Sequence, residues 1–230
     1  MKKSRIATLA VFFVMIPATL YLGTKIPGKS YYLTATLIIV WLMVPFFMKF
    51  EGKRPQAREL ILIAVMCALA VAGRVAIPIN HIKAAYAVIL ISGIAFGPET
   101  GFVVGAVTAL VSNFFYGQGA YMPWQMLAYG AGGMVAGFAF AKGKLPKKPI
   151  TMAVFGALTV ILLIGPLLDV CNTFLGMPEV TAATLAASFA SGFPVNAIQA
   201  VTTGVLTFFL GRPLLDKLER AKLKYGIGEV

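Results

Sequence analysis

Long apolar stretches alternate with short polar connections along most of this chain. Most of the stretches approach the ~20 residues that a helix needs to cross a bilayer. Two of them, 84–97 and 101–115, are shorter and suit tilted or partly buried helices. The full set comprises 6–22, 31–49, 59–79, 84–97, 101–115, 122–141, 150–168 and 186–211. The pattern therefore predicts an all-α integral membrane protein with eight helices.

The composition supports a membrane location. Hydrophobic residues make up 59% of the 230 residues, and charged residues make up 12%. Soluble domains contain about 45–50% apolar residues, so this much apolar surface needs lipid as its solvent. A net charge of +12 could also indicate nucleic-acid binding. Because the basic residues lie in short connections between apolar stretches, we read them as marking one side of the bilayer and expect no nucleic-acid partner.

Lysine and arginine are distributed unequally between alternate connections. With the N-terminus inside, both chain ends and the connections near 49–58 and 142–148 fall on the inside and hold most of the basic residues. The outside connections hold only Lys25, Lys29 and Lys83. Basic residues favour the cytoplasmic side, so we expect a multi-pass protein of the bacterial cell membrane with both termini in the cytoplasm.

One polar run divides the chain into two parts. The cytoplasmic linker 51–58 separates a two-span leader, 1–50, from a six-helix body, 59–215, which a basic cytoplasmic tail, 216–230, follows. The first apolar stretch resembles a signal peptide, but it lacks a good cleavage site and a second stretch follows, so we expect it to be retained. The leader has little polar chemistry, and function should reside in the body.

The segment 112–126 is the most informative part of the body. It combines amide and aromatic side chains at the rim of an apolar stretch: Asn113, Tyr116, Gln118, Tyr121, Trp124 and Gln125. Amides both donate and accept hydrogen bonds, and tyrosine and tryptophan offer apolar rings with polar tips. The distribution of basic residues places the predicted turn within this segment, 116–121, on the outside of the membrane. The segment predicts capture of a neutral, ring-bearing polar solute.

A second polar group lies near the outer end of the last stretch. Asn196, Gln199 and Thr203 are spaced so that they share one helix face. They could join the outer pocket or hold helices together. Asn172 lies in the predicted outer loop 169–179, which is either a lid or an ordinary connection.

Arg74 is the one basic residue deep within an apolar stretch. A charge inside a membrane is costly and is by default a candidate for function. Arg74 also lies about one turn from the outer end of its helix, so its side chain could instead reach the interface.

Small residues recur at four-residue spacing in several stretches. Ala64, Ala68 and Ala72 share one helix face, and their spacing alone favours internal packing over a docking face for another subunit. Two glycine ladders, at 97–105 and 130–137, predict helices that pack with their backbones close together.

Motifs for energy use or catalysis are missing from the sequence. It has no Walker sequence, no serine–histidine–aspartate set and no paired carboxylates in the apolar stretches. One histidine and two cysteines give no basis for a metal site. We therefore expect no enzymatic activity, no ATPase site and no intrinsic cofactor, and a transporter built from this chain alone would lack an energy source.

These features together resemble the substrate-binding S component of energy-coupling factor (ECF) transporters. The resemblance covers 59–215 and rests on the alanine face, the glycine-rich passage 91–107 and the segment 112–125. It implies two kinds of partner, a membrane T component and two ABC ATPases that use ATP. It also implies that the alanine face docks on the T component and that the subunit topples in the bilayer to deliver its vitamin.

The segment 112–125 further resembles the branch of the family that carries cobalamin or related corrinoids. Arg74 and the amide and aromatic residues above are then the expected ligand contacts. Riboflavin or a queuosine-type base are alternative ligands. Two other classes of function fit less well: a membrane enzyme acting on lipids would need acidic metal ligands or a nucleophile, and a purely structural subunit would not need the segment 112–126.

Overall fold

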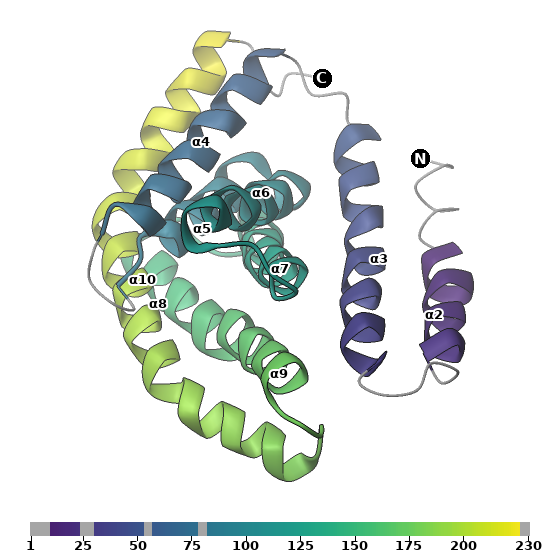
Figure 1. Cartoon of the computed structure of the whole chain (residues 1–230). Helices are drawn as coiled ribbons and strands as arrows, with labels where there is room; N and C mark the ends of the chain where they lie inside the picture. The colour runs from purple at the N-terminus through teal and green to yellow at the C-terminus, as the bar shows by residue number, and fades with distance from the viewer. Residues whose placement is uncertain (1–9, 24–29, 53–56, 78–81, 226–230) are drawn as a thin grey trace.

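The computed structural model describes residues 10–23, 30–52, 57–77 and 82–225 (Figure 1). All the secondary structure in these ranges is helical, as the sequence predicts. Several charges used for the predicted orientation lie outside the described residues: Lys2, Lys3, Arg5, Lys25, Lys29, Lys53 and Arg54.

The leader forms two antiparallel rods beside the body. The first consists of a short π-helix, η1 (Val11–Met15), continued by α2 (Ile16–Gly23), and the second is α3 (Ser30–Gly52). The Trp41 indole N–H donates to the Thr19 hydroxyl at 3.1 Å and joins the two rods. Helix α3 also packs against three helices of the body, so the leader is part of one packed structure.

Helices α5 (Ala85–Phe96), α6 (Pro98–Tyr116) and α7 (Met122–Phe140) form the centre of the body. Helix α5 is buried on nearly all sides, which fits the expectation of a partly buried helix for 84–97. Figure 1 shows α6 and α7 almost end-on, whereas α3 and α10 lie along the plane of the picture.

Glycines bring α6 and α7 into backbone contact, as the two ladders predict. A Cβ atom on Gly133 of α7 would lie 2.2 Å from the carbonyl oxygen of Gly101 on α6. A Cβ atom on Gly105 would lie 2.3 Å from the carbonyl oxygen of Tyr129. No side chain fits at these positions unless the helices separate.

Three further elements surround this centre. Helix α4 (Ala57–Val75) packs on α5 and α6. Helix α8 (Pro149–Thr159), the π-turn η3 (Val160–Ile164) and α9 (Gly165–Gly176) form one continuous rod. The long α10 (Ala182–Tyr225) curves along α8 and α9 (Figure 1).

Two helix ends differ from those predicted. The outer loop was expected to begin at Asp169, but α9 continues to Gly176 and leaves only 177–181 as the connection. A carboxylate that ends an apolar run therefore does not end this helix. At the other end of the chain, α10 continues through 216–225, most of the segment predicted as a tail.

Two of the described helical segments are long and apolar enough to cross a membrane by length and composition, Pro149–Gly176 and Ala182–Tyr225. The described helices occur where the sequence predicts apolar stretches. However, α5 is an apolar helix of only 12 residues. The predicted number of eight crossings remains a prediction.

Candidate functional site

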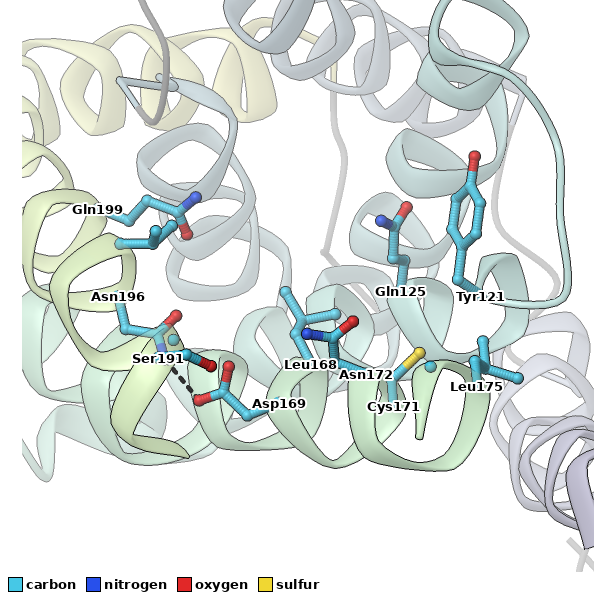
Figure 2. A pocket seen from close by; sticks show the side chains of 13 residues that line it. Tyr121, Gln125, Leu168, Asp169, Cys171, Asn172, Leu175, Ser191, Asn196 and Gln199 are labelled. Carbon is cyan, nitrogen blue, oxygen red and sulfur yellow. Dashed lines mark hydrogen bonds between the residues drawn. The ribbon is translucent and has the colours of Figure 1, made fainter. Parts of the chain in front are cut away.

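A cavity of about 580 Å³ opens between the N-terminal end of α7, the end of α9 and the first half of α10 (Figure 2). Its lining is rich in uncharged polar groups. The residues that shape it include Tyr121, Gln125, Leu168, Asp169, Cys171, Asn172, Ser191, Gly192, Val195, Asn196 and Gln199. Four of these carry side-chain amides, which can bind both donors and acceptors on a ligand.

Asp169 and Asn196 form the α9–α10 wall of the cavity. The Asn196 Nδ2 atom donates to Asp169 Oδ2 at 2.8 Å, and both side chains are buried (Figure 2). A Cβ atom at position 192 would lie 2.0 Å from Asp169 Oδ1, so a glycine there makes room for the carboxylate. This wall offers carboxylate oxygens, which accept hydrogen bonds when ionised.

Gln125 stands on the opposite wall, and Arg74 lies behind it. The Arg74 guanidinium donates to Asn113 Oδ1 at 3.0 Å and to Gln125 Oε1 at 3.3 Å, and it also donates to the Ser112 hydroxyl. Its Cζ atom lies 5.1 Å from the ring centroid of Tyr116. The Arg74 side chain is therefore buried among polar groups of α6 and α7.

Most of the expected site residues either line the cavity or lie directly behind it. Those that line the cavity are Tyr121, Gln125, Asn172, Asn196 and Gln199. Arg74 and Asn113 lie one layer behind Gln125. The hydroxyl of Tyr116 donates to the carbonyl oxygen of Arg74 at 2.7 Å, which ties α6 to the end of α4.

Gln118 and Trp124 lie outside the cavity lining, contrary to their expected place in one outer cluster. The Gln118 side chain is exposed and donates to the carbonyl oxygen of Leu110 at 3.3 Å. Trp124 is buried with Ile39 of the leader, and its ring centroid lies 5.5 Å from that of Phe174. Trp124 and Gln125 are adjacent in α7, and consecutive helical residues are roughly 100° apart around the helix axis, so the two side chains point in different directions.

Sequence reasoning missed Asp169, Ser191 and Gly192 as cavity residues. Asp169 directly follows the apolar stretch 150–168, a position that predicts an outer loop. Its spacing of three from Asn172 was an available signal, since residues three apart share a face once the segment is helical. Ser191 and Gly192 precede the amide stripe of α10 by one turn and carried no comparable signal.

The alanine face lies on the outer surface of the described structure. Ala64, Ala68 and Ala72 are exposed on α4. They line an apolar groove of about 660 Å³, whose other side is formed by α6 residues including Val107 and Phe115. Internal packing, which the spacing alone favoured, is therefore the wrong interpretation of these alanines.

The chemistry of the cavity suits reversible binding. Ser191 donates its hydroxyl hydrogen to the carbonyl oxygen of Ser188 at 3.1 Å. Within the described part of the chain, the cavity lining includes no histidine or lysine. The remaining polar lining consists of amides, a tyrosine and a carboxylate, which recognise a ligand by hydrogen bonds.

Comparison with known proteins gives two matches. A family model described as "ECF-type riboflavin transporter, S component" matches residues 55–216. A UPF0397 protein of Vibrio atlanticus (strain LGP32) is 31% identical over 118 residues, which are 48% of this chain and 64% of that relative. The chain thus spans less than two thirds of the length of this relative. No solved structure matches the chain.

Proposed function

Because the chain belongs to the family of ECF-type riboflavin transporter S components, we propose that it is the substrate-binding membrane subunit of an ECF vitamin importer. The observation that carries the proposal is the amide-lined cavity between α7, α9 and α10. The matched range, 55–216, includes every residue that lines it. The subunit captures its vitamin from outside the cell in this cavity.

A vitamin of riboflavin size and chemistry is the first candidate ligand. The cavity volume of about 580 Å³ lies within the ~300–1,000 Å³ typical of small-molecule sites. A flavin has a ring face and carbonyl and N–H groups at its edge, and the lining amides match these groups. The description of the matching family also favours this ligand.

A corrinoid is the second candidate, as the sequence suggests. The four lining amides, Gln125, Asn172, Asn196 and Gln199, match the many amide groups of cobalamin. However, a corrin macrocycle with its side arms is much larger than a flavin, so this cavity would enclose only part of it. A queuosine-type base is small enough to enter, but no further observation favours it.

The subunit works with partners that supply the energy. Its sequence has no Walker sequence, so we propose that two ABC ATPases hydrolyse ATP and that a membrane T component couples them to this chain. The exposed alanine groove of α4 supports docking on the T component there, because small side chains allow close helix contact in lipid. Toppling in the membrane would then deliver the vitamin to the cytoplasm.

A ligand panel tests the proposed function. Purified full-length protein in detergent is titrated with riboflavin, cobalamin and queuine by calorimetry. We expect saturable binding of riboflavin that is at least ~10-fold tighter than that of the other two, since the flavin suits the cavity size and lining and the description of the matching family favours it. Binding of cobalamin alone would replace the ligand and keep the class of function. Failure of all three to bind would contradict the proposal.

A further inference from the structure

The amide of Gln125 has one orientation that its neighbours permit. Its Oε1 atom accepts hydrogen bonds from Arg74 Nη2 at 3.3 Å and from Asn113 Nδ2 at 2.9 Å. The reversed amide would place its NH2 group against two donors. A guanidinium donates and never accepts, so Arg74 excludes that reversed state.

Asn113 reinforces this orientation and does not compete with it. Its Oδ1 atom accepts from Arg74 Nη1 at 3.0 Å, so its own amide nitrogen remains as the donor to Gln125. Asn113 is fully buried and Arg74 is 9% exposed, so water does not readily replace these bonds. The guanidinium therefore determines how both amides are turned.

The consequence appears on the cavity side of Gln125. With Oε1 held toward Arg74, the Nε2 group is directed into the cavity with its N–H donors. Figure 2 shows this nitrogen turned toward the side where Gln199 and Asn196 lie. The opposite wall has the reverse character, because Asp169 presents carboxylate oxygens beside Asn196.

The charged side chains are arranged in the same way as the hydrogen-bonding groups, with the positive charge on the donor side of the cavity and the negative charge on the acceptor side. Arg74 is buried behind the donor wall, and Asp169 is 8% exposed on the acceptor wall. Among the described residues, neither side chain forms a salt bridge. Such a pair of walls favours a neutral ligand whose own dipole is aligned with them.

We propose that the cavity selects its ligand by this donor-to-acceptor direction and that Arg74 is a positioning residue that acts through Gln125. The proposal rests on the proposed function. The ligand places a ring carbonyl oxygen against Gln125 Nε2 and an N–H or O–H group against Asp169. This defines the substrate class as a planar heterocycle with a carbonyl at one end and a hydrogen-bond donor at the other.

Gln125→Glu separates the proposal from a general effect of altering the cavity. The carboxylate keeps the size of the side chain and accepts from Arg74 and Asn113 as before, but it has no donor for the ligand. We expect the melting temperature without ligand to stay level or rise, because a buried guanidinium gains a carboxylate partner. Affinity for riboflavin should fall about tenfold or more because a ligand carbonyl loses its donor. Binding of cobalamin in place of riboflavin by the wild-type chain would overturn the proposed substrate class.

Gln199→Glu is the matched control. It adds the same charge to the same cavity, on a side chain that forms no hydrogen bond with Arg74 among the described contacts. We expect its melting temperature to fall below that of Gln125→Glu. Two results without ligand would overturn the proposal: a melting temperature of Gln125→Glu well below that of the wild type, or one no higher than that of Gln199→Glu. Either result would show that Oε1 does not face Arg74.

A mutant cycle tests the role of Arg74. Arg74→Met and Gln125→Ala should each weaken ligand binding, and the double variant should bind no more weakly than Gln125→Ala, because both act through one donor. Additive losses would overturn the positioning role. If the wild-type chain binds no vitamin, the proposed function fails, whereas the melting temperatures of the two glutamate variants still decide the orientation of Gln125.

Discussion

The contacts of Arg74 in the structure bear on both interpretations that its place in the sequence allows. Its depth in an apolar stretch left two interpretations, a functional charge or a side chain that reaches the interface. In the structure the guanidinium lies between α4, α6 and α7 and donates hydrogen bonds to Ser112, Asn113 and Gln125. A charge this deeply buried is retained at a cost, which fits a role in shaping the adjoining cavity.

The hydrogen bond between Asn196 and Asp169 gives a prediction about stability. Asn196→Leu keeps the size of the side chain but removes the donor that contacts the buried carboxylate at 2.8 Å. We expect a loss of about 1–3 kcal/mol in unfolding free energy, because a buried acceptor is left without its partner. Chemical or thermal unfolding of the purified protein in detergent measures this.

Asn172→Leu is the control for this variant. Asn172 also lines the cavity from α9, but its side chain is exposed. We expect a change within about 0.5 kcal/mol. Equal losses in both variants would indicate that the Asn196–Asp169 bond contributes no specific stability.

At the scale of elements, close approach of α6 and α7 positions the residues behind the cavity. Ser112 and Asn113 come from α6 and Gln125 comes from α7, so their contacts depend on the distance between these helices. The glycine contacts between Gly101, Gly105 and their α7 partners set this distance.

Gly133→Ala tests the helix contact. The added methyl group would meet the Gly101 carbonyl oxygen, a backbone atom that cannot turn away. We expect a loss of about 1–3 kcal/mol, as for other overpacked interiors. Gly52→Ala is the matched control, because nothing lies within 4 Å of its added Cβ atom. If both variants melt at the wild-type temperature, the two helices tolerate separation.

The alanine face of α4 is tested at the same scale. Ala68→Trp fills the exposed apolar groove between α4 and α6. We expect it to abolish co-purification of the T component. Vitamin affinity should stay unchanged, because the groove is separate from the cavity. Val154→Trp provides the control, since Val154 is 54% exposed on α8. Co-purification of the T component with Ala68→Trp at the wild-type level would remove the docking role.

The positions of most helices were predictable, because the lengths of the apolar stretches and the distribution of basic residues indicate them. The helices and the glycine contacts follow from composition and spacing, and the turn predicted at 116–121 is observed at 117–121. The cavity was only partly predictable. Adjacent residues of the segment 112–126 point in different directions once α7 forms, so Gln125 enters the cavity and Trp124 packs against Phe174.

Long-range packing accounts for the remaining differences. Nothing local in the sequence signals that α3 of the leader contributes Ile39 to a cluster with Trp124 and Cys171. Because Cys171 also lines the cavity, the leader supports the back of the site, although none of its described residues adds a polar group to the lining. At the scale of the whole molecule, leader and body form one support for the cavity.

The central claim is that the cavity between α7, α9 and α10 captures the vitamin. Val195→Trp tests it most directly, because Val195 lines the cavity and an indole there would occupy it. Val201→Trp is the control on the same helix, since Val201 is 66% exposed. Calorimetric titration with riboflavin should show binding by the wild type and Val201→Trp, and none by a folded Val195→Trp. Wild-type affinity in Val195→Trp would contradict the account.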